Sequence, residues 1–535
     1  MTAAPVAPGA AVADDADATA PADVCLLVEG TYPYVSGGVS SWVHDIIRGH
    51  PELSFSVLNI GSFPGSYTRR PYEVPSNVTA VHEVYCHEAK GAPLDVDGRQ
   101  ALEEEIVEAR RRSSERRHES RMLSAIGRLH LDDDIDDDLL ADLCSGDLDA
   151  AELLHGRAAF ELLAELGAAV APNAAFLDLF WHFRSIHVPV LRLLGAALPR
   201  ASCYHAVSTG YAGLLGAAAS YRTGRPLLLT EHGIYARERD MELSRADWIR
   251  DPDSDGAADL GIAATPSPLR GLWSRFFRAL SRLAYHHAAR ILTLSDVNRR
   301  KQLADGAPAH KIAIVPNGVE VSAGAGAPSN PGRPVGATAR VGGGRLRVGF
   351  VGRVVPIKDV ITFIRACDLA LRSVDLDVRL IGPQDEDGGY AGRCRELVAS
   401  LGRQHAIRFV GPQPPDQIYG DLDVIVLTSF SEGQPLVILE AYAAGIPVVV
   451  TDVGACREMV EGRSAADRRL GPSGIVTRVA APAETAAALV TLARKPALRQ
   501  SMGQAGRRRV SDFYHRRGML DAYRTLYTEM VAWPA

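Results

Sequence analysis

Two carboxylates eight residues apart lie in the stretch 429–451, SFSEGQPLVILEAYAAGIPVVVT, which is otherwise small, turn-forming or apolar. Glu432 lies in a loop sequence, whereas Glu440 lies in an apolar run of helix length. Pro435 suits the first turn of that helix, and Gly-Ile-Pro at 445–447 marks its end. A carboxylate in apolar surroundings is costly unless it is hydrogen-bonded. We therefore expect Glu440 to meet a ligand or a partner side chain, and Glu432 to be either a ligand contact or a capping residue.

Two basic residues follow a predicted strand in the second half of the chain. Arg353 comes directly after Gly352 at the end of that strand, and Lys358 follows where a helix is predicted to begin. A guanidinium fork and a compact ammonium beside a helix N-terminus suit phosphate oxygens. These residues therefore predict a diphosphate site, with ordinary surface charges as the alternative.

Three short turns are further candidates for contact with a ligand through their backbone. They are Gly411-Pro412, Gly433-Gln434 and Gly37-Gly38. The first follows a predicted strand and offers its backbone to a flat ring. The second begins the helix that bears Glu440, where a leaving anion would be stabilised. The third separates a strand at 24–28 from a helix at 41–48, so it either aims N–H groups at an anion or forms a plain tight turn.

Short apolar runs alternate with helical segments along the chain, which is the pattern of parallel βα units. In the first half, strands are predicted at 24–28, 55–59, 78–84, 204–208, 227–230, 291–295 and 312–315. In the second half, strands are predicted at 347–351, 378–381, 407–410, 424–427, 447–451 and 474–477. The predicted fold class is α/β, with two Rossmann-like doubly wound domains facing each other across a cleft at the carboxyl ends of both sheets.

Changes in composition predict the domain boundaries. The predicted parts are a disordered tail at 1–22, a first domain at 23–320 with a charged helical insertion at about 89–167, a Gly/Ala/Pro/Ser linker at 321–345, a second domain at 346–505, and a helix at 506–535 that packs back on the first domain. The charged insertion is either a solvated face or a docking surface. An amphipathic helix at 271–290 belongs either to the core or to a membrane surface.

Composition excludes several classes of protein. A chain of 535 residues, 47% hydrophobic and 23% charged, is a globular protein of several domains. Its net charge of −6 disfavours a nucleic-acid binder. No apolar run has the length of a membrane span and the N-terminus lacks the features of a signal peptide, so we expect a cytoplasmic protein, with peripheral attachment to the inner face of the membrane left open. The odd number and the spread of the seven cysteines argue against a disulfide framework or a zinc site.

Together these features predict a nucleotide-sugar site. Glu440 would accept hydrogen bonds from ribose hydroxyls, Arg353 and Lys358 would neutralise the diphosphate, and Glu432 would hold hydroxyls of the sugar. The acidic run 385–387 would either hold a hard cation or form a polar loop. The basic pair leaves a metal little to do, so no metal or other cofactor is expected.

The spacing Glu432-x7-Glu440, with Gly352-Arg353…Lys358 before it, resembles the retaining glycosyltransferases of family 4, which have the GT-B fold. The segment Pro316-Asn317-Gly318 and the loop at 32–40 match the same family. The stretches CLLVEGTYPYVSGGVSSWVH and TEHGIYARERD are more specifically similar to the cytosolic glycosyltransferase subunits of the Pel exopolysaccharide machinery. Asp359 stands where the broader family usually has glycine.

The resemblance implies that His232 lies near the donor sugar, that Asn317 belongs to the nucleotide-sugar site, and that catalysis needs no metal. The implied partners are a UDP-sugar donor, a polysaccharide acceptor and membrane-bound synthase subunits. The expected reaction is transfer of a sugar from a UDP-sugar to a growing exopolysaccharide, with retention at the anomeric carbon. A nucleotide-sugar epimerase or a phosphorylase of similar fold, and a non-catalytic UDP-binding scaffold, are the alternatives.

Overall fold

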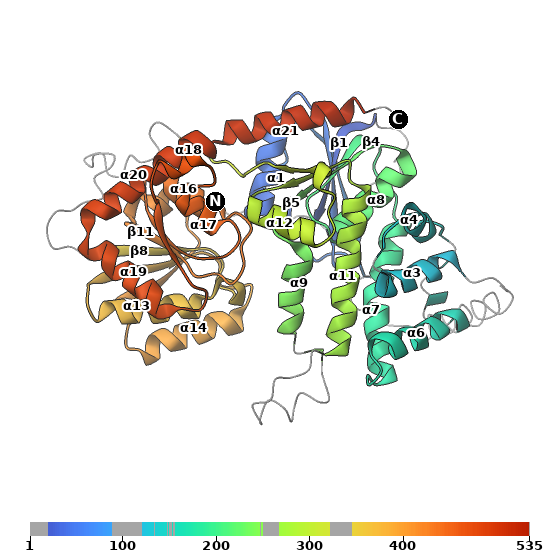
Figure 1. The fold of residues 1–535 in the computed structure, drawn as a ribbon, viewed down its shortest axis with the longest axis horizontal. Coiled ribbons are helices and arrows are strands. Elements are labelled where there is room, and N and C mark those ends of the chain that lie inside the picture. Colours follow the sequence, from blue (N-terminus) through green and yellow to red (C-terminus); the bar gives the residue numbers. More distant parts are fainter. Residues whose placement is uncertain are drawn as a thin grey trace.

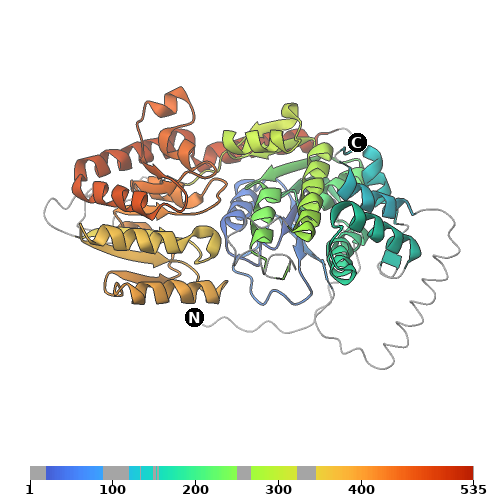
Figure 2. The same ribbon diagram turned by 60° about the horizontal axis from the view of Figure 1, so that its bottom comes forward.

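The computed structural model describes residues 20–87, 120–321 and 345–533, apart from 133, 147, 149–151, 154–155, 247 and 250–266. Figure 1 shows two bodies of sheet and helix, with the second half of the chain in orange and red. Figure 2 shows the same two bodies, with the helices of the insertion on the side of the first domain away from the second. The predicted tail, linker and first part of the charged insertion lie almost wholly outside the described residues.

The first domain is built on a parallel sheet of seven strands in the order β3-β2-β1-β4-β5-β6-β7. The strands are β1 (Ala22–Glu29), β2 (Phe55–Gly61), β3 (Val78–Tyr85), β4 (Ala201–Ala206), β5 (Leu227–Glu231), β6 (Arg290–Thr293) and β7 (Ile312–Ile314). Strand β1 lies between β2 and β4 and is parallel to both. The central strands are apolar on both faces because helices cover both faces, which explains their continuous apolar runs.

The helices of this domain fall into two groups. Those that alternate with the strands are α1 (Gly38–Gly49), α8 (Tyr211–Thr223), α9 (Tyr235–Ser244), α11 (Pro268–His287) and α12 (Asp296–Ala304). The insertion between β3 and β4 contributes α3 (Arg121–Leu131), α4 (Asp137–Leu143), α6 (Arg157–Val170) and α7 (Phe176–Gly195). The apolar face of α11, including Trp273, Phe276 and Leu280, is buried in the core of this domain, which favours the core interpretation of the helix predicted at 271–290.

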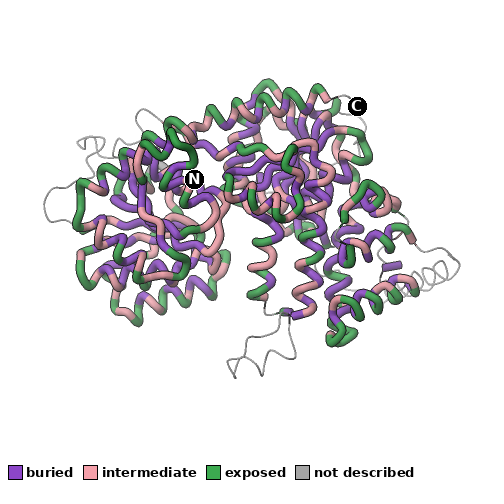
Figure 3. Tube along the Cα trace, in the orientation of Figure 1, coloured by how far each residue is buried: buried purple, intermediate pink, exposed green. Residues whose placement is uncertain are grey.

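The second domain has a parallel sheet of six strands in the order β10-β9-β8-β11-β12-β13. Its strands are β8 (Leu346–Val351), β9 (Leu376–Ile381), β10 (Ile407–Gly411), β11 (Val424–Leu427), β12 (Val448–Thr451) and β13 (Gly474–Thr477). Its helices are α13 (Val360–Leu371), α14 (Gly388–Ser400), α15 (Pro415–Ile418), α16 (Leu436–Ala443), α17 (Cys456–Glu461), α18 (Ala465–Arg468), α19 (Pro482–Arg494) and α20 (Pro496–Phe513). Figure 3 shows the strands of both sheets as buried and the outer faces of the helices as exposed. The prediction of two doubly wound α/β domains is confirmed.

The last helix, α21 (Arg516–Val531), runs from the second domain to the first (Figure 1). Its tyrosines are fully buried against the first sheet, where the Tyr527 hydroxyl lies 2.7 Å from Nδ1 of His205 and the Tyr523 hydroxyl lies 3.0 Å from Oγ1 of Thr230. The return to the first domain thus begins at Arg516 rather than at residue 506, because α20 continues to residue 513 and packs on α16 of the second domain.

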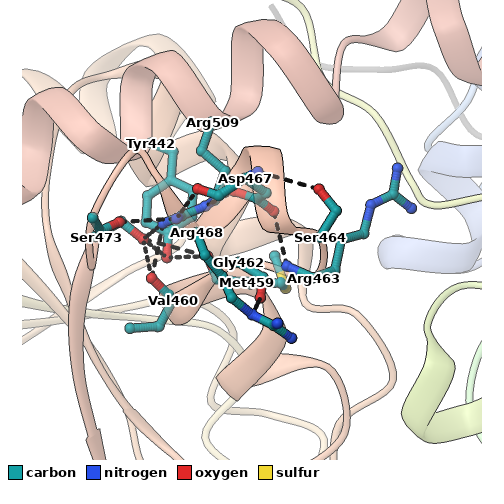
Figure 4. Close-up of polar contacts among 11 residues, drawn as sticks. Tyr442, Met459, Val460, Gly462, Arg463, Ser464, Asp467, Arg468, Ser473 and Arg509 are labelled. Atoms are coloured by element: carbon teal, nitrogen blue, oxygen red, sulfur yellow. Dashed lines mark hydrogen bonds and ion pairs between the residues drawn. The ribbon is translucent and has the colours of Figure 1, made fainter.

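A buried ion pair fixes α20 in the second domain (Figure 4). The guanidinium of Arg509 donates to Asp467 at 2.5 Å, and neither side chain is exposed. Arg509 also donates to Oγ of Ser473 at 2.7 Å, and Ser473 in turn donates to the hydroxyl of Tyr442 on α16 at 2.6 Å. Since α16 also bears Glu440, this network sets the position of the helix that carries the predicted nucleotide contact.

Among the described residues, no helix combines the length and the apolarity that a membrane crossing requires.

Candidate active site

Loops that follow strands of both sheets meet where the two domains touch. This contact region, which joins His232 to Gly433 and Asn317 to Gln434, is called the seam. A Cβ on Gly433, in the loop after β11, would lie 1.8 Å from the carbonyl oxygen of His232, in the loop after β5. A Cβ on Gly454, after β12, would lie 1.9 Å from the carbonyl oxygen of Glu432. Because a side chain at either glycine would clash with backbone, these residues let the loops pack directly. The carboxyl ends of the two sheets therefore face one another, as predicted for a ligand cleft.

Glu432 and Lys358 form an ion pair at this seam. Nζ of Lys358 donates to Oε1 of Glu432 at 2.6 Å, and Oγ of Ser429 donates to the same oxygen at 2.6 Å. The Glu432 side chain is 9% exposed and that of Lys358 is 20% exposed, so the pair is largely shielded from water. Glu432 is thus held in place by its loop and is not a helix cap, because α16 begins after Pro435 with no side-chain cap.

Asp359 takes the place of the glycine that the resemblance implies after Lys358, and it fixes the conformation of this loop. Its φ of +45° lies in the left-handed region, which aspartate tolerates better than most residues. Its Oδ1 accepts a hydrogen bond from the backbone N–H of Thr362 at 3.2 Å and caps α13, while its carbonyl accepts from Oγ1 of Thr428 at 2.9 Å. These bonds direct Lys358 toward Glu432.

Glu440 lies in α16 and is largely buried. Its Oε2 accepts a hydrogen bond from the hydroxyl of Tyr419, so the partner expected for this carboxylate includes a protein side chain. Burial raises the pKa of Glu440, and the bond from Tyr419 opposes this rise. A carboxylate with one fixed donor retains acceptor positions for further donors such as hydroxyls.

Arg353 donates to Glu386 at 2.5 Å, and both side chains are about half exposed. Asp387 caps α14 by accepting from the backbone N–H of Tyr390 at 2.8 Å. The acidic run 385–387 therefore has an arginine and a helix N-terminus as protein partners, which favours its interpretation as a polar loop. This contact uses Nη1 of Arg353, so other N–H groups of the guanidinium remain available to an anion.

His232 packs edge-on against Trp42, with ring centroids 4.6 Å apart. Its Nε2 is buried and has no hydrogen-bond partner among the described residues. Burial lowers the pKa of His232 to about 4, so the imidazole is neutral near pH 7. A neutral ring with an unpaired nitrogen can exchange a hydrogen bond with an uncharged sugar hydroxyl.

The structure brings two other predicted residues together. Oε1 of Gln434 accepts from the backbone N–H of Asn317 at 2.6 Å, so both residues take part in the contact between the domains. Gly38 begins α1, and a Cβ at this position would lie 3.9 Å from Cδ1 of Leu436 in α16, whereas a Cβ on Gly37 would meet nothing within 4 Å. The Gly37-Gly38 loop thus faces the helix of Glu440 across the seam.

Gly352 and Gly411 lie at the ends of strands β8 and β10, with Gly382 between them. The backbone N–H of Gly382 donates to the carbonyl of Gly411 at 3.0 Å, and a Cβ on Gly382 would lie 2.1 Å from the carbonyl oxygen of Gly352. All three have positive φ, which favours glycine. Pro412 directly follows the edge strand β10, so it lies at the carboxyl edge of the same sheet.

Sequence reasoning missed several residues of this region: Ser429, Tyr419, Gly382 and Glu238. Glu238 lies in the first turn of α9, where its carboxylate packs against Gly233. Burial, together with the charge of Glu231, raises the pKa of Glu238 to about 7, and Glu432 adds to the rise. Its place six residues after His232, in TEHGIYARERD, was the available signal.

A cavity of about 500 Å³ adjoins the loop of Glu432 at the seam. Its lining includes Arg300 and Lys301 from α12 of the first domain, and Phe430, Ser431 and Arg457 from the second. The lining also holds the carboxylates of Asp452, Glu458 and Glu461, two of which pair with Arg457, so a hydroxylated molecule would fit its mixed charges.

Comparison with known families divides the chain at the same place as the structure. Residues 22–310 match a family model described as "Domain of unknown function (DUF3492)". Residues 345–495 match the family described as "Glycosyl transferases group 1".

Relatives known by name are similar over part of their length. A protein of Kineococcus radiotolerans named D-inositol 3-phosphate glycosyltransferase is 32% identical over 246 residues, 42% of this chain and 54% of its own length. A protein of the same name from Acidothermus cellulolyticus is 29% identical over 324 residues, 58% of this chain and 63% of its own length. The chain thus spans about half the length of the curated relatives it matches.

Solved structures show the fold over nearly the whole chain. A sucrose-phosphate synthase of Thermosynechococcus elongatus superposes with a TM-score of 0.56 at 15% identity, over 95% of this chain and 99% of its own. Anabaena Alr3699/HepE, in complex with UDP and glucose, superposes with a TM-score of 0.53 at 14% identity and the same coverage. The two-domain architecture is therefore that of GT-B glycosyltransferases.

Proposed function

This chain belongs to the family described as a domain of unknown function (DUF3492), and we propose that it is a retaining glycosyltransferase that moves a sugar from a UDP-sugar to a growing exopolysaccharide. The proposal applies to the whole chain, because the site uses loops from both domains. The match of residues 345–495 to group 1 glycosyl transferases supports the donor side. The structural neighbour solved with UDP and glucose supports UDP as the nucleotide.

The observation that carries the proposal is the Lys358–Glu432 ion pair at the seam, with His232 and Gly433 in contact beside it. Lys358 and Glu432 lie at the carboxyl edge of a parallel sheet and are shielded from water. On binding of the donor, each can exchange the other for a different group of the ligand. Lys358 would receive phosphate oxygens, and Glu432 would receive sugar hydroxyls. Glu440, with Tyr419 fixed on one oxygen, would accept from the ribose.

The proposed roles of the residues follow from the positions at which charge develops during sugar transfer. As the glycosidic bond breaks, negative charge grows on the departing UDP and the sugar becomes oxocarbenium-like. Lys358 and Arg353 would stabilise the phosphate charge, together with the N–H groups at the start of α16. The acceptor hydroxyl then attacks on the face from which UDP departs and gives its proton to the departing diphosphate oxygen. Neutral His232 would hold a sugar hydroxyl during this step.

Contact between the domains would exclude water from the reaction. The seam already joins Asn317 to Gln434, and the backbone N–H of Val297 to Glu458 at 3.1 Å. Since water competes with the acceptor hydroxyl for the donor sugar, exclusion favours transfer over hydrolysis. Within the proposal, the acceptor lies on the first-domain side, and no metal takes part.

We propose an exopolysaccharide as the acceptor because the Gly37-Gly38 loop and the stretch TEHGIYARERD are similar to the Pel glycosyltransferase subunits. The same similarity underlies the proposal of membrane-bound synthase subunits as partners. The curated relatives are named for a phosphorylated cyclitol acceptor, so inositol phosphate belongs in the acceptor panel of any assay.

The test is an incubation of the full chain with a panel of UDP-, GDP- and ADP-sugars, with and without acceptor oligosaccharides or inositol phosphate. Released nucleotide and the masses of products are measured. Acceptor-dependent UDP release with a product one sugar heavier is the expected result. A converted UDP-sugar without acceptor would identify an epimerase, and UDP binding without any turnover would identify a scaffold.

A further inference from the structure

A carboxylate and two histidines meet where the insertion contacts the first domain. Asp137 is the first residue of α4, and His286 and His287 are the last two residues of α11. Oδ1 of Asp137 lies 3.0 Å from Nε2 of His286, and one ligand atom from each of the three residues lies within 4.8 Å of the others. Three residues from two elements distant in sequence thus form one cluster.

The cluster lies away from the candidate active site. Helix α11 ends three residues before β6 begins, so His287 stands at the amino edge of the first sheet. All strands of that sheet are parallel, and His232 follows the opposite, carboxyl edge. A group bound at Asp137 therefore cannot reach the donor site, and its role is separate from sugar transfer.

The side chain of His287 supplies a second observation, besides the clustering, that points to a bound ligand. Its Nε2 is buried and has no hydrogen-bond partner among the described residues. A buried polar atom without a partner is costly, and native structures mostly avoid it.

We propose that Asp137, His286 and His287 bind a zinc ion, or a transition metal ion of similar preference, that ties the insertion to the first domain. Two imidazole nitrogens and one carboxylate oxygen suit zinc, whereas magnesium and calcium prefer oxygen ligands alone. Three protein ligands leave one tetrahedral position for water. The proposal does not depend on the function proposed for the cleft.

The surroundings set limits on the affinity. The Lys311 ammonium donates to the backbone carbonyl of His286 at 2.5 Å, and its charge also disfavours a cation beside His287. The site is therefore expected to bind zinc more weakly than a closed four-ligand structural site does. The apolar side chains Leu139, Leu140 and Leu143 of α4 pack in the core of the first domain without the metal, so the ion adds to an existing contact and does not create it.

The test is equilibrium dialysis of the untagged full chain against zinc chloride, with bound zinc measured by elemental analysis. The wild type is expected to bind one zinc ion that His286→Ala/His287→Ala does not bind. His310→Ala is the matched control, because His310 is exposed and lines a cavity with His287 but lies outside the cluster. Equal zinc binding by wild type and double variant would overturn the proposal.

A milder substitution keeps the test valid if the double variant fails to fold. Asp137→Asn keeps the size of the side chain but removes the charge of the carboxylate ligand. It is expected to lower zinc affinity at least about tenfold and to abolish the zinc-dependent rise in melting temperature, with the melting temperature in EDTA unchanged. A zinc-dependent rise equal to that of the wild type would contradict the assignment.

Discussion

Lys358 and Glu432 are joined by an ion pair of 2.6 Å between two loops that follow β8 and β11 of the second domain. The pair is mostly buried, and Gly433, the residue after Glu432, touches the backbone of His232 in the first domain. In the proposed reaction each charge exchanges this partner for a group of the donor. Nucleotide binding must therefore break the pair, and the free energy gained from phosphate and sugar contacts must exceed that of the pair.

Glu432→Gln is expected to separate binding from turnover. The substitution keeps the shape but removes the charge that competes with phosphate for Lys358, so affinity for UDP alone stays equal or rises. Turnover of the UDP-sugar falls by about 10²-fold or more, because the contact to the sugar in the transition state is weakened. Calorimetric titration of UDP and a UDP-release assay measure the two effects.

Glu161→Gln is the control for this substitution, since Glu161 lies on α6 of the insertion, exposed and paired with Arg157. Turnover of Glu432→Gln equal to that of this control would show that the carboxylate has no role in transfer.

Gly433→Ala is expected to disturb the seam between the domains. Its Cβ would lie 1.8 Å from the carbonyl oxygen of His232, so the loops must move apart. We expect turnover to fall at least about tenfold, since displacement of reacting groups by about 1 Å costs up to about 10²-fold. UDP affinity should change less, because Lys358 and Glu440 both lie within the second domain.

The control is Gly271→Ala, where a Cβ would meet nothing within 4 Å and where alanine favours the helix α11. Steady-state turnover and UDP titration on both variants provide the comparison. A Gly433→Ala variant as active as Gly271→Ala would mean that the seam is not closed during catalysis.

Arg509→Ala is expected to destabilise the second domain strongly. Removal of the guanidinium leaves the carboxylate of Asp467, which is not exposed, without its charged partner, and a loss of about 3–5 kcal/mol is typical of such a change. Differential scanning calorimetry should show a lower melting temperature for the second domain. Arg508→Ala, at the exposed neighbouring residue, should melt like the wild type. Equal melting of the two variants would mean that the network in Figure 4 contributes little to stability.

Glu238 gives a prediction for the dependence of stability on pH. Burial raises the pKa of its carboxyl to about 7 in the folded protein, above the ordinary value of 4.5. Between these values the folded state binds more protons than the unfolded state, so this group lowers the free energy of unfolding as pH rises from about 4.5 to about 7. Glu238→Gln should remove that slope, which urea unfolding at pH 5 and pH 8 would reveal. The same pH dependence in variant and wild type would contradict the burial of the charge.

The sequence predicted the strands well because each is a short apolar run that the sheet buries on both faces. It also placed Glu440 correctly in a buried helix, from the conflict between its charge and its neighbours. It did not reveal Tyr419 as the partner of Glu440, because the two residues are 21 positions apart and meet only when the chain before β11 and the helix after it fold together. The partner of Arg353, Glu386, was hidden for a similar reason.

The contact between the domains was also beyond sequence reasoning. Gly433 looked like a residue that a nucleotide approaches, yet its close neighbour is the carbonyl of His232, 201 positions earlier in the chain. Gln434 and Asn317 were assigned separately to the nucleotide-sugar site, and the structure pairs them with each other. The end of the second domain was predicted at residue 505, whereas α20 continues to residue 513, with Arg509 paired to Asp467 in that domain.

The donor site is tested most directly by calorimetric titration of UDP into the wild type, Lys358→Ala, Glu440→Ala and the exposed-lysine control Lys495→Ala, each verified as folded by its melting curve. The wild type and Lys495→Ala should bind UDP alike. Lys358→Ala and Glu440→Ala should each lose about 1.5–3 kcal/mol, the usual contribution of hydrogen bonds to charged groups, which is roughly ten- to a hundredfold in affinity. Wild-type affinity for UDP in both variants would contradict the site.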